Sequence, residues 1–123
     1  MNFNQKLQQL VEDTEGGIAC ILMGRDGLAI DSYESSNQTT TFNSSTFGIE
    51  FTNIFNQLIQ MTKQTHFDTP RELTIHSNSQ VAIFHLLTEE YFILLTLTAE
   101  GNSGKGRYLL RKAVPLLQQE LFS

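Results

Sequence analysis

One segment limits the possible folds more than any other. Tyr91-Phe92-Ile93-Leu94-Leu95-Thr96-Leu97 is the most continuously apolar run in the chain, yet it is far shorter than the roughly 18 residues of a membrane span. A strand with one face in water would alternate polar and apolar residues. The run therefore predicts a central strand buried on both faces, and Ile18–Met23, which is almost wholly apolar, predicts a second buried strand.

Turn residues connect these runs to partner strands. Gly24-Arg25-Asp26-Gly27 contains residues able to take positive φ, so Leu28–Tyr33 is expected to return beside Ile18–Met23 as a hairpin. The stretch from Glu34 to Thr41 is polar and short-sided, which predicts a mobile loop.

A second hairpin is indicated by a period of two in residues 72–76, followed by a polar turn and the apolar residues 81–87. A turn centred between Asn78 and Ser79 sets a register in which Glu72 lies opposite His85. The same register gives the pairs Leu73–Phe84 and Ile75–Ala82.

Three segments have helical periodicity. A short helix is predicted over residues 2–13, and a long amphipathic helix to about Thr65. The long helix has three candidate N-caps, Asn43, Ser44 and Ser45. A last helix is predicted from about Lys105 to Leu121. Pro115 lies inside it and removes one backbone hydrogen bond, so this helix either bends near Arg111 or ends early and restarts.

The predicted order is helix, two strands, helix, three strands, helix, which is an α+β pattern. A chain of 123 residues and 13.9 kDa suits one domain spanning residues 1–123. A domain of this size buries a single core and leaves little room for a deep active-site cavity.

The residue types used in catalysis and metal binding lack the spacings that those functions need. His66, His76 and His85 are 10 and 9 residues apart, so no two of them form a metal motif. Cys20 is the only cysteine and has apolar neighbours, which predicts a buried thiol instead of a nucleophile. We therefore expect no catalytic, cofactor-binding or metal-binding residues and no enzymatic activity.

The glycine-rich segment Gly101–Gly106 follows a predicted strand and opens a predicted helix, which is where phosphate loops occur. A Walker A loop is longer and has Ser or Thr after its lysine, whereas Lys105 is followed by Gly106. We favour a tight strand-to-helix turn, with Ser103 as the N-cap, over nucleotide binding.

The net charge of -5 argues against nucleic acid as the main partner, because phosphate binding needs clustered cations. The basic residues are nevertheless concentrated: Lys105, Arg107, Arg111 and Lys112 are half of the total of 8 and have no acid among them. Cations at the start of a helix are disfavoured by its macrodipole, so helix stability does not explain them. We predict that they bind an acidic partner; a solvated face is the open alternative.

The middle helix carries a larger aromatic face than a two-layer domain of this size usually needs. A second copy covering this face would remove an apolar patch from water. The predicted dimer surface combines this face with the edge strand near residue 74. It comprises Phe47, Phe51, Ile54, Phe55, Leu58, Leu73 and Ile75.

The element order, the hairpin with Gly24–Gly27 at its tip and the segment Gly101–Arg111 resemble the roadblock/LC7 family over nearly the whole chain. Within the family, Ala19–Gly27 and Gly104–Arg111 are most similar to the bacterial MglC-type branch, a sister of the MglB type. The resemblance implies a five-stranded antiparallel sheet with the middle helix on one face and the terminal helices on the other. It also implies dimers formed through middle helices and edge strands.

The function that the resemblance implies is that of a non-catalytic homodimeric adaptor in cell polarity and motility control. Its implied partners are an MglB-like roadblock protein and a response regulator similar to RomR, with neither nucleic acid nor membrane among them. The alternative is direct activation of a Ras-like GTPase of the MglA type. The first residues resemble no signal peptide, so a cytoplasmic protein, recruited to a cell pole, is expected.

Overall fold

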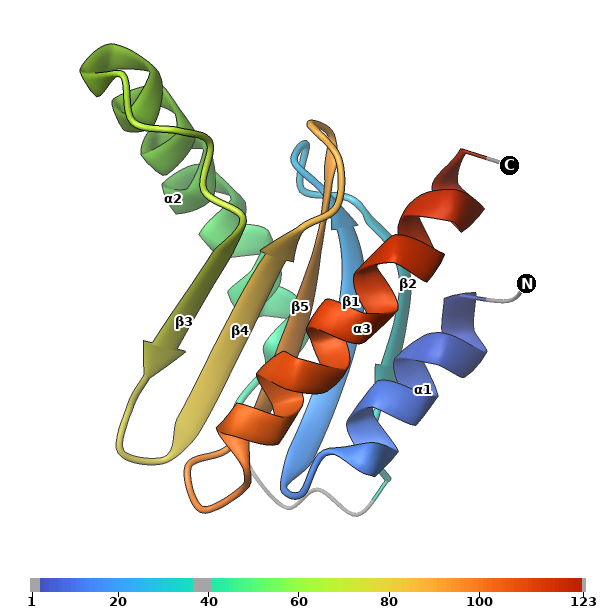
Figure 1. Cartoon of the computed structure of the whole chain (residues 1–123). Helices are drawn as coiled ribbons and strands as arrows, with labels where there is room; N and C mark the ends of the chain where they lie inside the picture. The colour runs from blue at the N-terminus through green and yellow to red at the C-terminus, as the bar shows by residue number, and fades with distance from the viewer. Residues whose placement is uncertain (1–2, 37–40, 123) are drawn as a thin grey trace.

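The computed structural model describes residues 3–36 and 41–122, so the predicted loop at Glu34–Thr41 lies partly outside the described residues. A five-stranded antiparallel sheet separates one helix from two (Figure 1). The order along the chain is α-β-β-α-β-β-β-α, as predicted. The elements are α1 (Phe3–Asp13), β1 (Gly17–Gly24), β2 (Ala29–Glu34), α2 (Ser44–Thr65), β3 (Glu72–His76), β4 (Gln80–Leu86), β5 (Tyr91–Thr98) and α3 (Ser103–Leu121).

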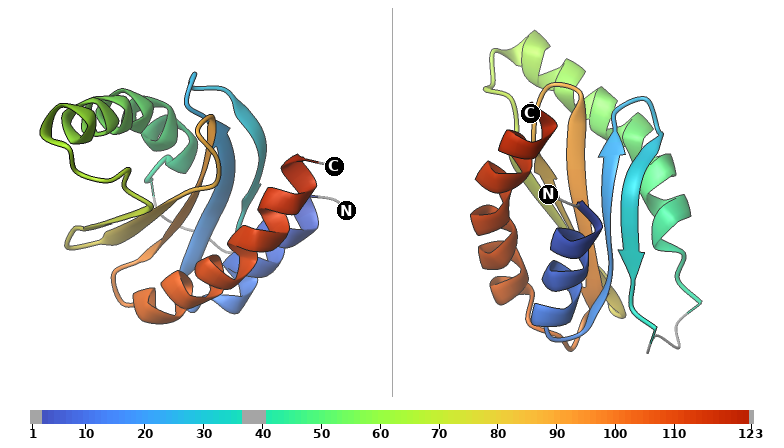
Figure 2. Two further views of the ribbon diagram at one scale, coloured as in Figure 1. Left: turned by 45° about the horizontal axis from the view of Figure 1, so that its top comes forward. Right: turned by 90° about the vertical axis from the view of Figure 1, so that its right-hand side faces the viewer.

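The central strand is β5, as its unbroken apolar run predicts. The strand order is β2-β1-β5-β4-β3, and residues 92–97 of β5 are all buried. Helices α1 and α3 cover one face of the sheet and α2 covers the other (Figure 2). Each face has its own hydrophobic cluster, because neighbouring side chains of a buried strand point to opposite faces.

The predicted register of the second hairpin is confirmed. Glu72 pairs with His85, Leu73 with Phe84 and Ile75 with Ala82. In the first hairpin Gly27 has a φ of 91°, a conformation that L side chains rarely adopt, which explains a glycine at this point of the turn.

The helix ends follow from local chemistry. Asn43 caps α2, and its Oδ1 accepts a hydrogen bond from Thr46 N at 2.9 Å. The N-cap of α3 is Asn102, which accepts from Lys105 N at 3.0 Å, so the prediction of Ser103 was wrong by one residue. Pro115 lies on the exposed side of an uninterrupted α3, and the alternative of an early end with a restart is wrong.

No helix in the described part of the chain is both long enough and apolar enough to span a membrane.

Candidate protein-binding surfaces

Strand β3 is an edge of the sheet whose outer side is open. Arg71 O accepts from Leu86 N at 2.8 Å, and Ser77 N donates to Gln80 O at 2.9 Å, so the backbone of odd-numbered residues faces β4. The backbone groups of Glu72, Thr74 and His76 therefore point away from the sheet. Within residues 3–36 and 41–122 no hydrogen bond reaches these outward groups. The edge is a template for a further strand.

An apolar stripe of α2 accompanies this edge. Ile54 is 57% exposed and Met61 is 46% exposed, while Phe47 and Leu58 are half-buried. The half-buried side chains pack against the same cluster as Leu73 and Ile75 of β3. The β3 edge and this stripe, together called the β3–α2 edge surface, contain the exposed and half-buried members of the predicted dimer surface: Phe47, Ile54, Leu58, Leu73 and Ile75.

The other two predicted members, Phe51 and Phe55, belong to the core of the single chain. They are 4% and 3% exposed, respectively. The Phe51 ring stacks on Phe84 with 3.8 Å between centroids, and Phe55 lies 5.4 Å from Phe92. The aromatic face is therefore largely absorbed by aromatic residues of β4 and β5. The sequence pattern predicts Phe47, Phe51 and Phe55 together on a face left over for a partner. For Phe51 and Phe55 this interpretation is corrected, because both rings pack inside the single chain.

The four clustered basic residues do not form one surface. Arg111 Nε donates to Glu72 Oε2 at 2.6 Å and its second terminal nitrogen donates to Oε1 at 2.9 Å, a bidentate pair that ties α3 to β3. The hydrogen bond from Arg111 lowers the pKa of the Glu72 carboxyl. His85 Nε2 lies 3.9 Å from Glu72 Oε2, the cross-strand contact that the register predicts. Arg111 is thus already engaged within the chain.

The next member of the cluster, Lys112, lies on a different side of α3. Lys112 Nζ lies 5.5 Å from the centroid of the Tyr108 ring, on the side of α3 that faces α1. Lys105 is exposed at the first turn of α3, and Arg107 is half-buried. Arg111 and Lys112, adjacent in sequence, therefore serve different sides of the helix.

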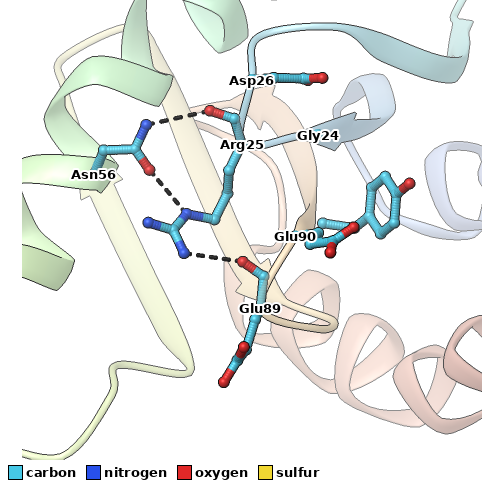
Figure 3. Close-up of a pocket in the computed structure, with 7 residues that line it drawn as sticks. Gly24, Arg25, Asp26, Asn56, Glu89 and Glu90 are labelled. Carbon is cyan, nitrogen blue, oxygen red and sulfur yellow. Dashed lines mark hydrogen bonds between the residues drawn. The ribbon is translucent and has the colours of Figure 1, made fainter.

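Arg25 has a role that was not anticipated from the sequence. Its Nε donates to Asn56 Oδ1 at 2.8 Å and a terminal nitrogen donates to Glu89 O at 2.9 Å, while Asn56 Nδ2 donates back to Arg25 O at 3.2 Å (Figure 3). These bonds join the β1–β2 turn to α2 and to the β4–β5 turn. They border an open pocket of about 460 Å³.

The glycine-rich segment before α3 has structural explanations. A side chain at Gly101 would collide with Glu15 O, and one at Gly106 would press on Thr14 and Ile83. The N–H of Lys105, in the first turn of α3, has no partner within the helix and donates to Asn102 Oδ1 instead.

The thiol and the candidate metal ligands can be placed in the described residues. Cys20 is fully buried, as predicted, and burial raises the pKa of its thiol. Among the residues that the structure describes, no group of three or more His, Cys, Asp or Glu side chains is placed to hold a metal ion.

Similarity to known proteins was found among solved structures. No protein-family model matches the chain, and no curated protein sequence matches it. MglC from Myxococcus xanthus is 31% identical, with 98% of this chain and 99% of that chain covered and a TM-score of 0.70. A roadblock/LC7 domain from Streptomyces avermitilis is 10% identical over 100% of both chains, with a TM-score of 0.84. The gliding protein MglB from Thermus thermophilus is 13% identical over 94% of this chain and 88% of that chain, with a TM-score of 0.79.

The last two likenesses show the shared fold, while the first adds identity along nearly the full length. The chain belongs to the roadblock/LC7 family. Within that family it is MglC-like.

Proposed function

We propose that the chain is a non-catalytic homodimeric adaptor in a gliding-motility and cell-polarity system. The observation that carries this proposal is the β3–α2 edge surface, where unpaired strand groups adjoin exposed apolar side chains. A second copy placed antiparallel across β3 supplies the missing strand and covers Ile54 and Leu58. Residues 1–123 act in this proposal as one domain.

The proposed partners are an MglB-like roadblock protein and a response regulator similar to RomR, in the cytoplasm and at a cell pole. The similarity to MglC supports this choice. Lys105 and Arg107 are the members of the basic cluster that we propose for contact with an acidic partner, together with Lys112. Arg111 contributes indirectly, because its guanidinium holds Glu72 in β3.

Two measurements test the proposal. Light scattering after size exclusion is expected to give twice the chain mass of 13.9 kDa. Titration with the MglB-like protein and the response regulator is expected to show binding that weakens with salt, because exposed charges are screened. A monomeric chain at high micromolar concentration contradicts the dimer, and absence of binding to both proteins contradicts the adaptor role.

Charge reversal tests the basic residues. Lys105→Glu combined with Arg107→Glu is expected to weaken partner binding while the dimer persists. We choose these two residues because Arg111→Glu would place a second carboxylate beside Glu72 and disturb β3. Unchanged affinity moves the partner contact away from the start of α3.

Direct activation of a GTPase is distinguished by turnover. An adaptor alone leaves the rate of GTP hydrolysis by an MglA-type GTPase unchanged. An acceleration by this chain in the absence of other roadblock proteins replaces the adaptor proposal with direct activation.

A further inference from the structure

A groove runs between α1 and α3, on the face of the sheet opposite to α2. The two helices lie side by side and run in opposite directions (Figures 1 and 2). The groove has a volume of about 270 Å³. The β3–α2 edge surface lies elsewhere, so a dimer formed there leaves both copies of this groove open.

The floor of the groove is apolar. Leu10 and Ala113 are buried beneath it, Leu109 is half-buried, and Leu116 is 42% exposed. Leu109, Ala113 and Leu116 recur at i, i+4 and i+7, so one face of α3 is directed toward α1. Ala113 is small, which leaves the middle of the groove open enough for another helix to approach closely.

The rim of the groove is basic on both walls. Lys6 comes from α1 and Lys112 from α3, whereas Asp13 is the acid among the lining residues. Lys112 is positioned by its contact with the Tyr108 ring, and Tyr108 itself is 57% exposed. In a chain of net charge -5, a lysine on each wall above an apolar floor favours an acidic occupant.

We propose that this groove binds an amphipathic helix of a partner protein, with its apolar ridge on Leu109 and Leu116 and an acidic residue between Lys6 and Lys112. A helix is the expected occupant because both walls are helices, whose backbone groups are already paired, and ridges of a third helix fit between them. Asp13, at the other end, selects a basic residue and so sets the direction of the bound helix. The inference deepens the proposed function, since an adaptor needs a surface that dimerisation leaves free.

The test uses a displayed library of 15-residue amphipathic helices with a Leu, Ile and Ala ridge and rim positions varied among Glu, Gln and Lys. Binders are selected on the full chain, and the best peptide is titrated by fluorescence anisotropy. We expect enriched peptides to be acidic at the rim near one end. We also expect Leu116→Glu and Lys112→Glu each to weaken binding at least about tenfold, the usual cost of losing an interface anchor.

Ile49→Glu is the matched control, because Ile49 is 47% exposed on α2, outside the groove. Replacing the selected peptide's acidic rim residue with Lys is expected to restore its binding to Lys112→Glu. Enrichment of basic peptides, peptides insensitive to both groove variants, or no enrichment overturns the proposal. Light scattering on the unmodified chain separates the two hypotheses: a dimer without peptide binding refutes the groove alone, and peptide binding by a monomer refutes the proposed dimer alone.

Discussion

The two edge strands of the sheet, β2 and β3, differ in whether their outward backbone groups have hydrogen-bond partners. At the β2 edge, Ser32 N donates to Asp31 Oδ1 at 2.8 Å, and Ser32 O accepts from Asn4 Nδ2 at 2.9 Å, so side chains occupy both backbone groups. At the β3 edge, the outward groups of Glu72, Thr74 and His76 have no such partner within the described residues. The β2 edge thus has one outward residue, Ser32, whose backbone groups are already occupied, whereas in the described part of the chain the β3 edge has none among Glu72, Thr74 and His76.

In the proposed dimer, this difference would set how many copies can join. A sheet with two open edges can add copies without limit, whereas a sheet with one open edge closes after a single twofold pairing. Asn4 comes from α1, so the helix that covers one face of the sheet also protects its edge.

The largest effect is expected from Thr74→Pro. The N–H of Thr74 points away from β4, so proline removes a donor to the second copy and no bond of the sheet itself. We expect a monomer by light scattering at concentrations where the wild type is dimeric. Thr74→Val keeps the N–H and is expected to remain dimeric. A dimer that survives Thr74→Pro excludes pairing through β3.

Opening the protected edge is expected to have the next largest effect. Asn4→Ala combined with Asp31→Ala frees the backbone of Ser32, and species larger than a dimer should form as concentration rises. Analytical ultracentrifugation measures their distribution. Gln8→Ala, also on α1 but bonded to Glu12, is the control that should stay dimeric. If the double variant also stays dimeric, the two bonds do not protect the edge.

A moderate effect on dimer dissociation is expected from Ile54→Asp. This variant shows whether the apolar stripe of α2 contributes to dimerisation in addition to β3. Ile54 is 57% exposed in the single chain, so the melting temperature of the monomer should hardly change while dimer dissociation increases at least about tenfold. Ile49→Asp is the control on the same helix. Equal dissociation constants for both variants would limit the interface to β3.

Phe51→Asp is unsuitable for this purpose, because Phe51 lies in the core of the single chain. Even Phe51→Ala is expected to cost about 3–5 kcal/mol of unfolding free energy through the cavity it leaves.

The smallest effect concerns Glu72, which connects the open edge to α3. Because the hydrogen bond from Arg111 lowers the carboxyl pKa in the folded state, the pair stabilises the fold above the ordinary pKa of 4.5 and loses that contribution as pH falls through the folded value. Wild type and Glu72→Gln should therefore differ slightly in melting temperature at pH 7 and converge well below pH 4.5. Arg111→Gln should show the same pH dependence of the melting temperature. The double variant Glu72→Gln with Arg111→Gln should lose no more stability than either single variant. A difference that persists at low pH contradicts this assignment.

Sequence patterns were enough to predict the order of elements, the central strand, the register of β3 on β4 and the buried thiol. These features depend on local periodicity, on turn residues and on long apolar runs, all of which act within one segment or between adjacent ones. The resemblance of Gly101–Arg111 to the roadblock/LC7 family was likewise visible within a single segment of the sequence. The surface members of the edge, Leu73 and Ile75, were also predictable, because alternation in a short strand shows which side chains share a face.

Which parts of each helix remain exposed, and which charged side chains are free to bind a partner, depends on the packing of distant segments. Periodicity assigned Phe47, Phe51 and Phe55 to one stripe, but only the aromatic residues of β4 and β5 determined which of them are buried. The pairing of Arg111 with Glu72 spans 39 positions, the bond from Arg25 to Glu89 spans 64, and the protection of Ser32 by Asn4 spans 28. Such contacts form because the packed sheet brings distant segments together, and no pattern within a segment records them.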